Sequence, residues 1–280
     1  MIKSKYIPGV MMAWKILFRA MLLSLFINLL SFKALAQAPV DSSRVVRVLT
    51  FNIYHGETMK GDFDLDRIAD VIRSTDPDLV ALQEVDFNTN RAKNMDLATE
   101  LGIRTGLAPL FGQAMPYDGG EYGEGILSQY SFLNTKNHAL SAGQGKEPRA
   151  ALEVNVLLKS KDTIRFIGTH LDHTKEETDR ITQAYELNRF FAKDDKPSIL
   201  AGDLNATPGS QTMNILLKEW KRSSSKDEPT APAVNPRVKI DYILSRPAHR
   251  WRVLETRVIN DEIASDHRPV LSVLELLPGK

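Results

Sequence analysis

Two different spacings of apolar residues alternate along the first part of the chain. Residues 45–51 form a β-branched apolar run, which predicts a strand that ends at Asn52. Residues 65–72 then repeat apolar positions at helical spacing, and Asp76-Pro77 ends this predicted helix. The nearly continuous apolar run at 78–83 is suited to a buried strand. This order of strand, helix and strand indicates a layered α/β or α+β domain.

The rest of the chain is richer in predicted strands. The pattern predicts strands at 125–128, 132–140, 151–159, 163–169, 198–201, 239–244, 251–259 and 270–276, and helices at 176–192 and 213–217. Residues 221–236 are rich in Ser, Lys, Pro and Ala, so we expect a mobile surface loop there. Because no boundary is visible after residue 44, we expect one domain over residues 44–280, preceded by a short polar lead-in at 37–43.

The first 36 residues follow another pattern. A positively charged start precedes an apolar run at 21–32 and the small-residue segment Ala34-Leu35-Ala36, which is the order of a secretory signal peptide. The alternative is a retained membrane anchor, but the run has only about 12 residues and a spanning helix needs roughly 20. We therefore expect cleavage near Ala36 and a periplasmic or secreted protein.

Composition narrows the classes of function. Hydrophobic residues make up 42% and charged residues 25% of the 280 residues, as in a soluble globular protein. The chain has no cysteine, which excludes disulfides, thiolate metal sites and a lipid attached to cysteine. Without the five basic residues of 1–36, 31 basic and 35 acidic residues remain, a net charge of −4. This charge disfavours a protein that grips long duplex nucleic acid.

Polar residues lie repeatedly within or just after the apolar strands. They are Asn52, Glu84, His170, Asp203, Asn205, Asp241, Asp266 and His267. Strand ends at one edge of a layered sheet meet in a crevice, where several carboxylates would repel one another unless a cation joined them. Carboxylate and amide oxygens suit Mg²⁺, Mn²⁺ or Ca²⁺. Each residue alone is explained by a turn, a cap or a structural histidine, so the argument depends on their occurring together.

Six segments occur together in a recognisable order. They are Thr50-Phe51-Asn52, Leu82-Gln83-Glu84-Val85, Gly168-Thr169-His170-Leu171, Gly202-Asp203-Leu204-Asn205, Ile240-Asp241-Tyr242-Ile243 and Ser265-Asp266-His267-Arg268-Pro269-Val270. These segments resemble the endonuclease/exonuclease/phosphatase superfamily, which includes deoxyribonucleases, apurinic endonucleases, bacterial sphingomyelinases and inositol polyphosphate 5-phosphatases. The resemblance runs over residues 45–276. It implies a four-layer α/β/β/α sandwich with two central mixed β-sheets.

The resemblance also implies roles around the metal. Glu84 is expected to be the main metal ligand, with Asn52 and Asp266 beside it. His267 is expected to be the general base that activates water, oriented by Asp266. Apurinic endonucleases carry an acid two positions after the matching asparagine, where this chain has Tyr54. Tyr54 and the following histidine are therefore candidates for facing the substrate. The alternative for Tyr54 is that it packs under the sheet edge.

Other residues are expected to hold the phosphate. His170, Asp203 and Asn205 resemble the groups that stabilise charge on the phosphate and on the leaving oxygen. Asp241 is expected to orient a histidine, with His170 as the expected partner. Arg149 resembles a phosphate-contacting basic residue of deoxyribonucleases. Tyr122 and Arg91 are further candidates for substrate contact, the alternatives being an ordinary loop aromatic and a solvated loop charge.

We therefore expect an exported hydrolase of phosphodiester bonds that uses Mg²⁺ or Mn²⁺ and an in-line attack by water. The substrate stays open between nucleic acid, a small phosphoester and a phospholipid headgroup; residues 107–117 are the one candidate for a lipid-facing apolar segment. A non-catalytic binding module of the same fold is the alternative class, but it would be expected to have lost Glu84, Asp203 or His267. No stable protein partner is implied, and we expect a monomer.

Overall fold

Two six-stranded sheets form the centre of the domain in a computed structural model, which describes residues 39–279. The expected signal peptide at 1–36 lies outside these residues. The first sheet contains, in spatial order, β11 (Trp251–Val258), β12 (Val270–Leu276), β1 (Val45–Asn52), β2 (Leu79–Phe87), β4 (Gly120–Ser128) and β3 (Ala108–Tyr117). The second contains β5 (Phe132–Leu140), β6 (Arg149–Leu157), β7 (Thr163–His170), β8 (Ser198–Asp203), β10 (Asp241–Arg246) and β9 (Lys221–Arg222).

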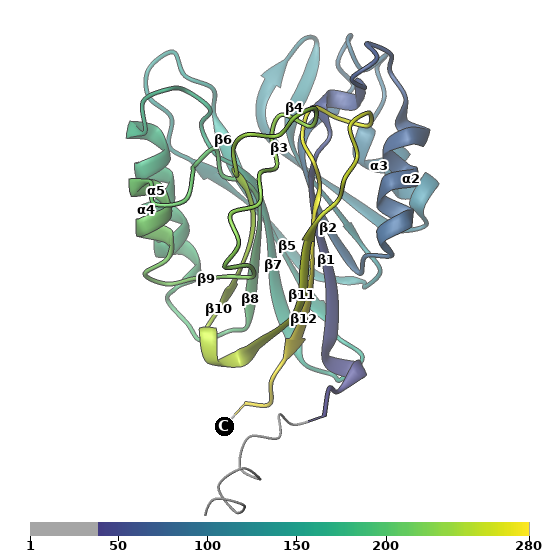
Figure 1. Cartoon of the computed structure of the whole chain (residues 1–280). Helices are drawn as coiled ribbons and strands as arrows, with labels where there is room; N and C mark the ends of the chain where they lie inside the picture. The colour runs from purple at the N-terminus through teal and green to yellow at the C-terminus, as the bar shows by residue number, and fades with distance from the viewer. Residues whose placement is uncertain (1–38, 280) are drawn as a thin grey trace, which may run out of the picture. The chain divides into compact units, whose positions relative to one another are not determined.

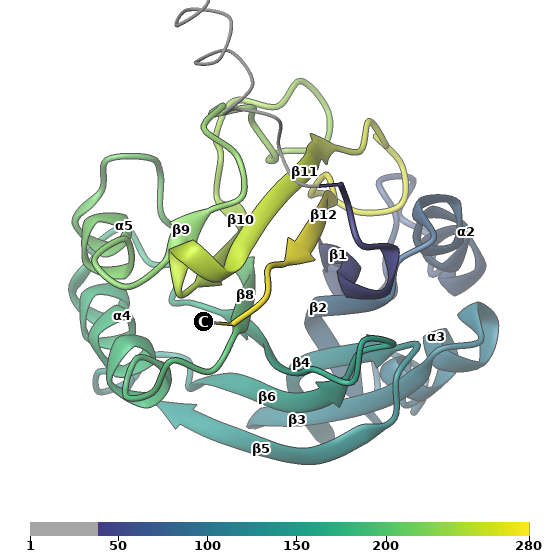
Figure 2. The same ribbon diagram turned by 90° about the horizontal axis from the view of Figure 1, so that it is seen from below.

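Helices cover the outer face of each sheet. The helices are α2 (Leu65–Thr75) and α3 (Leu97–Thr105) on the first sheet, and α4 (Thr178–Phe191) and α5 (Gln211–Leu216) on the second, with short 3₁₀ turns η2 (Ser42–Arg44), η3 (Tyr54–Gly56) and η4 (Ala248–Arg250). Figures 1 and 2 show the resulting order of helices, sheet, sheet and helices. The expected four-layer α/β/β/α sandwich is confirmed. No helix within residues 39–279 is long and apolar enough to span a membrane.

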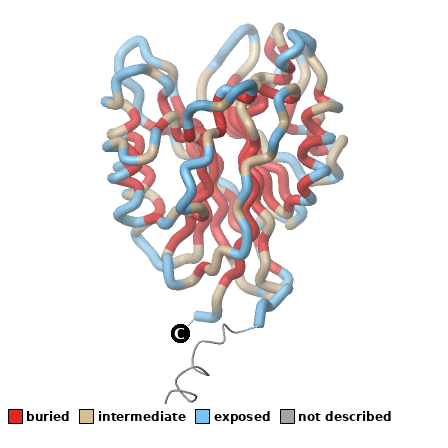
Figure 3. Tube along the Cα trace, in the orientation of Figure 1, coloured by how far each residue is buried: buried red, intermediate tan, exposed pale blue. Residues whose placement is uncertain are grey.

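Strand β1 is almost continuously apolar because both of its faces are covered. Val46 and Val48 point into the core between the two sheets, whereas Leu49 and Phe51 point towards the helices of the first sheet. Successive side chains of a strand face opposite sides, so a strand covered on both sides needs apolar residues at both. Figure 3 shows this burial running through both sheets, with exposed residues on the outer helices and loops.

Helix α3 and strand β3 were not expected from the sequence. Helix α3 has nine residues, and β3 is an edge strand whose residues are mostly exposed or half-buried, so neither has a strong apolar pattern. The suggestion that residues 107–117 form a lipid-facing segment is wrong. Leu110 packs against the core between the two sheets, and Phe111 packs against the core between the first sheet and its helices. The strand pairs with β4 along its length.

The expectation of a mobile surface loop at 221–236 is also wrong. The segment begins with β9, and Thr230 and Ala233 are fully buried further along. Ala231 forms a β-bridge with Val238. The composition of this segment predicted a solvated loop, because composition does not reveal contacts with residues that are distant in the sequence.

Candidate active site

Strand register brings the polar residues of the six segments to one edge of the two sheets. In the first sheet, Asn52 ends β1, which runs parallel to β2. In the second sheet, His170 at the end of β7 lies opposite Asp203 of β8, and Asp203 lies opposite Asp241 of β10. These three side chains are almost completely buried. The sheets face each other, so both rows contribute to one site.

Glu84 reaches this site through an irregularity in β2. The register between β2 and β4 shifts between Leu82 and Val85, and the φ angle of Glu84 is +58°. A bulge of this kind redirects a side chain, and a positive φ is unfavourable for a residue other than glycine. Tyr54, His55 and Asn205 also have positive φ angles, of +46°, +44° and +46°. Four of the residues with positive φ angles therefore lie at the site.

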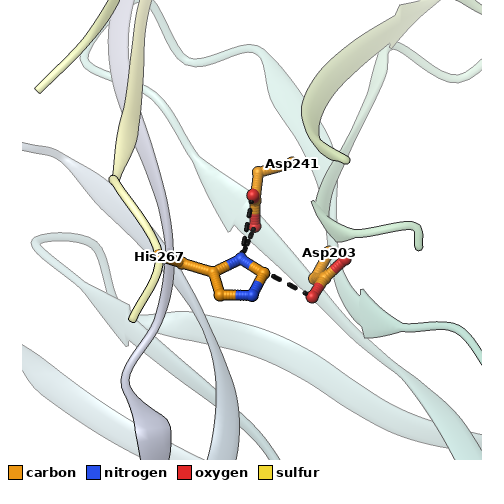
Figure 4. A group of neighbouring side chains, drawn as sticks. All are labelled: Asp203, Asp241 and His267. Carbon is orange, nitrogen blue, oxygen red and sulfur yellow. Dashed lines mark hydrogen bonds and ion pairs between the residues drawn. The ribbon is translucent and has the colours of Figure 1, made fainter. Parts of the chain in front are cut away.

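His267 and Asp241 form a hydrogen-bonded pair. Nδ1 of His267 lies 3.0 Å from Oδ2 and 3.2 Å from Oδ1 of Asp241, and 3.7 Å from Oδ2 of Asp203 (Figure 4). Burial opposes the charged ring, but the carboxylates of Asp241 and then Asp203 outweigh burial and raise the pKa of His267 to about 10. Burial and the nearby Asp241 raise the pKa of Asp203.

Two expected pairings are therefore wrong. Asp241 orients His267 and not His170, because the register of β10 places it beside the loop between β11 and β12. Asp266 makes no hydrogen bond to His267 among residues 39–279; its Oδ1 accepts one from Ser265 at 3.3 Å. Burial raises the pKa of Asp266; the charge of His267 opposes this effect, and the charge of Glu84 adds to it.

His170 is surrounded by polar groups that keep it neutral. Its Nε2 lies 3.0 Å from Nδ2 of Asn205 and 3.4 Å from Oδ2 of Asp203. Burial and the charge of Arg149 hold the pKa of His170 well below its usual value. Asn205 also donates to the carbonyl of Leu171 at 3.0 Å, which fixes its amide beside the histidine. Both amide hydrogens of Asn205 are thus used within the protein, and Nδ1 of His170, which has no hydrogen-bond partner among residues 39–279, is the donor that remains in this pair.

Glu84 remains ionised within this cluster. Nδ2 of Asn52 donates to Oε1 of Glu84 at 3.1 Å, and to Oδ2 of Asp203 at 3.3 Å. Nδ1 of His55 lies 3.6 Å from Oε2 of Glu84. Burial alone would raise the pKa of Glu84, but the contact with His55, together with nearby histidine charge and the Asn52 amide, lowers it to about 2. An ionised carboxylate is thus available to a cation at neutral pH.

A second group of ligand atoms lies nearby. The ligand atoms of Asp203, Asp241 and His267 all lie within 4.8 Å of one another, which is close enough to share a cation. Nδ1 of His267, however, carries the proton that it donates to Asp241 and so has no free lone pair for a metal. The Glu84 side of the site therefore fits a resident cation better.

The residues enclose a cavity of about 390 Å³. Its lining residues are Tyr54, His55, Glu84, Arg91, Met115, Tyr117, Tyr122, Glu147, Arg149, His170, His173, Asp203, Asn205 and His267. All three expected substrate-contact residues, Arg149, Tyr122 and Arg91, are among them. Tyr54 and His55 line the cavity as well, which resolves the alternative left by the sequence. Met115 and Tyr117 were missed, since they belong to the edge strand that the pattern did not predict.

Arg149 lines the cavity and has two buried nitrogens without a partner among the described residues. Its side chain is 2% exposed, and Nη2 donates to Oε2 of Glu147 at 2.9 Å and lies 3.0 Å from Nδ1 of His173. Within residues 39–279, its buried Nε and Nη1 have no hydrogen-bond partner. Burial raises the pKa of the nearby Glu124 well above its usual value, although the charge of Arg149 opposes this effect. A buried guanidinium with free donors suits an anion such as phosphate.

The segment 229–238 holds both members of the histidine–aspartate pair. Oγ1 of Thr230 accepts hydrogen bonds from the backbone N–H of Ile240 and of Asp241, at 3.2 and 3.3 Å. The carbonyl of Thr230 accepts from the N–H of Arg268 at 2.7 Å, and the N–H of Ala233 donates to the carbonyl of Asp266 at 2.6 Å. Thr230 thus connects β10 to the loop that carries His267.

The chain matches one protein family in sequence and several solved structures in fold. A model of the Endonuclease/Exonuclease/phosphatase family matches residues 49–267. Among solved structures, an endonuclease/exonuclease/phosphatase from Beutenbergia cavernae is 24% identical with a TM-score of 0.68, covering 84% of this chain and 72% of that one. A mannosyl-6-phosphatase from Bacteroides thetaiotaomicron is 18% identical (TM-score 0.67; coverage 82% and 99%), and the human nocturnin catalytic domain is 18% identical (TM-score 0.65; coverage 85% and 96%). At these identities the structural likeness supports the fold.

Proposed function

Because the chain belongs to the endonuclease/exonuclease/phosphatase family and is a phosphoester hydrolase, we propose that it is an exported enzyme that hydrolyses phosphodiester bonds with Mg²⁺ or Mn²⁺. The observation that carries this proposal is the position of the Asp241–His267 pair in a cavity that also contains Glu84 and Arg149. Export rests on the sequence of residues 1–36.

The residues on the Glu84 side fit a hard cation. Glu84 and Asp266 supply carboxylates, Asn52 supplies an amide, and the chain has no cysteine to favour a softer metal. We assign the cation to these three residues. A bound divalent cation supplies Lewis acidity towards the phosphoryl oxygens.

The chain's own groups would perform the proton transfer and the binding. In its neutral form, His267 would take a proton from the attacking water through Nε2, while Asp241 holds Nδ1 and stabilises the resulting imidazolium. Because Asp241 and Asp203 raise the pKa of His267 to about 10, the neutral ring depends on the positive charge of a bound cation, which would lower that pKa. Arg149, which lines the cavity, binds the phosphate through its guanidinium group. His170, held in place by Asn205, stabilises negative charge on the phosphate and on the leaving oxygen.

A monoesterase acting on a small phosphoester is the second candidate. The cavity of about 390 Å³ favours it, because that volume is near the lower end for ligand sites and is suited to a compact substrate. The net charge of −4 without residues 1–36 also disfavours long nucleic acid. The structural likeness to a mannosyl-6-phosphatase supports the same candidate at the level of fold.

The test is hydrolysis of bis-(p-nitrophenyl) phosphate and of p-nitrophenyl phosphate by the purified protein, with Mg²⁺, with Mn²⁺ and with chelator. We expect turnover that needs the cation, is lost in His267→Ala, and is unchanged in His249→Ala, which alters an exposed histidine. Faster cleavage of the diester supports a diesterase, and faster cleavage of the monoester supports the second candidate. A folded protein without turnover on either ester would favour the non-catalytic binding module. Cell fractionation tests export: the protein should leave the cytoplasm in a form that begins after Ala36.

A further inference from the structure

The two arginines of the cavity differ in how far their charges are neutralised. Arg149 gives one nitrogen to the half-exposed Glu147 and keeps two nitrogens without a partner among the described residues. Arg91 donates from Nε and Nη2 to the two oxygens of Asp86, at 2.6 and 2.8 Å, and the Asp86 side chain is completely buried. A two-point pair with a buried carboxylate neutralises the arginine and fixes its plane. The cavity therefore offers one strong position for an anion, at Arg149.

Arg91, Tyr117 and Tyr122 form one wall of the cavity. Its guanidinium carbon lies 4.5 Å from the centre of the Tyr117 ring and 5.7 Å from that of Tyr122, and the two rings are 6.0 Å apart. Tyr117 is 40% exposed and Tyr122 is 7% exposed, and both line the cavity. Burial and the charge of Glu84 raise the pKa of the Tyr122 phenol well above its usual value, so it stays a neutral hydroxyl group. Met115 completes the wall.

This wall is held in place before any ligand binds. Asp118, in the turn between β3 and β4, accepts a hydrogen bond from the N–H of Arg91 at 2.7 Å and one from Nδ2 of Asn90 at 3.2 Å. The carbonyl of Asp118 accepts a further bond from the N–H of Asn90 at 2.9 Å. The turn that carries Tyr117 is thus connected to the loop that carries Arg91. A preformed wall binds without the cost of ordering mobile groups.

We propose that this wall, formed by Arg91, Met115, Tyr117 and Tyr122, binds the leaving group of the substrate, and that this group is an uncharged, hydroxyl-bearing ring about the size of a hexose. The proposal rests on the phosphoesterase function proposed above. The apolar C–H face of such a ring can pack on Tyr117. Its hydroxyl groups can bond to the phenol of Tyr122 and to Nη1 of Arg91, which has no partner within residues 39–279.

A second phosphate fits this wall poorly. The charge of Arg91 is already neutralised by Asp86, and the carboxylates of Glu84 and Glu147 also line the cavity. Like charges that are brought together in a part-buried site repel strongly. The same argument disfavours a nucleic-acid strand, which would place a further phosphate on each side of the scissile one.

Competition against bis-(p-nitrophenyl) phosphate hydrolysis tests the leaving-group proposal. The competitors are inorganic phosphate, glucose 6-phosphate, glucose 1,6-bisphosphate and adenosine 5′-monophosphate. We expect glucose 6-phosphate to inhibit about fivefold more strongly than inorganic phosphate, and the bisphosphate to inhibit no better than glucose 6-phosphate. Tyr117→Ala should remove this advantage and leave the inhibition constant of inorganic phosphate unchanged. Tyr185→Ala, which alters an exposed tyrosine of α4, should preserve the advantage.

Several results would overturn the proposal while leaving the phosphoesterase function intact. Strongest inhibition by the bisphosphate would show that the wall accepts a second anion, and strongest inhibition by the nucleotide would show that it selects a base. A Tyr117→Ala protein that loses inhibition by inorganic phosphate and by glucose 6-phosphate equally would show that the wall does not act on the ring. If the protein hydrolyses no ester, the function proposed above fails. Calorimetric titration with glucose 6-phosphate and with inorganic phosphate then tests the role of the wall directly. We expect glucose 6-phosphate to bind about fivefold more tightly than inorganic phosphate, and this difference to be lost in Tyr117→Ala.

Discussion

Nδ1 of His267 lies 3.0 Å from Oδ2 of Asp241, a residue 26 positions earlier in the chain and in a different sheet from the strands that flank His267. The neighbouring residue Asp266 makes no such contact among the described residues, although it is adjacent in sequence. Two acidic residues near one histidine therefore make different contacts. Asp241 bonds to the histidine ring, whereas Asp266 accepts a hydrogen bond from Ser265 and interacts electrostatically with both His267 and Glu84.

This division predicts different defects in two matched variants. Asp241→Asn should lower kcat by about 10³-fold, because the ring of His267 loses the partner that fixes its tautomer and stabilises its charge. Asp266→Asn should instead raise the concentration of Mg²⁺ needed for half-maximal rate. Steady-state kinetics at several Mg²⁺ concentrations measure both effects. An Asp266→Asn protein with an unchanged Mg²⁺ requirement and the larger loss of kcat would contradict the assignment.

Thr230 is predicted to act as a positioning residue for the Asp241–His267 pair. In Thr230→Val the hydroxyl oxygen that accepts from the N–H of Asp241 is lost with little change of shape. We expect kcat to fall about tenfold with KM unchanged, and the free energy of unfolding to fall by about 1–2 kcal/mol, the cost of a buried N–H without a partner. Urea unfolding and steady-state kinetics measure the two effects. Thr230→Ser keeps the oxygen and should restore both; equal defects in the two variants would argue against the hydroxyl group.

Arg149 is predicted to bind the phosphate through its fork of donors. Arg149→Met should raise KM about 100-fold, and Arg149→Lys about tenfold, because lysine keeps the charge but cannot place two parallel N–H groups. The inhibition constant of inorganic phosphate should rise in the same order. Arg73→Met, on the exposed face of α2, serves as the control. Unaltered phosphate inhibition in Arg149→Lys would show that the fork is not used.

Acid stability should depend on the ion pairs of Arg165, far from the catalytic groups. This guanidinium bonds to Oε1 of Glu153 at 3.0 Å and to Oδ2 of Asp194 at 2.8 Å. The hydrogen bond from Arg165 lowers the pKa of Asp194; for Glu153, burial raises the pKa, but His138 and Arg165 outweigh it and lower the pKa. Folded pKa values below the unfolded ones mean that this stabilisation is present above about pH 4 and is lost as the pH falls further.

Urea unfolding at pH 7 and at pH 3 measures this dependence. Asp194→Asn should reduce the free energy of unfolding at pH 7 by up to about 1 kcal/mol, since Asp194 is partly exposed, and should have a smaller effect at pH 3. Asp195→Asn is the matched control, because Asp195 has no ion pair among residues 39–279. An equal loss at both pH values in Asp194→Asn would show that its charge does not contribute.

Several features were predictable because they depend on local pattern. The apolar runs that end in Asn52, His170 and Asp203 predicted buried strands with polar ends. Neighbouring parallel strands place such ends at the same edge of a sheet. Helix α3 and strand β3 escaped prediction. A short helix and a half-exposed edge strand carry little periodic signal, and Tyr117 was missed with them.

The sequence by itself determined the family of the protein, its sandwich fold and the set of polar residues at the site, because strand periodicity and motif order are properties of the chain. Only the tertiary structure decided which residues act together. The register of β10 pairs Asp241 with His267, buried Asp86 neutralises Arg91, and Thr230 holds the loop of the histidine. These contacts depend on the distances and orientations of side chains in space. Residue types and their spacing along the chain do not specify those distances and orientations.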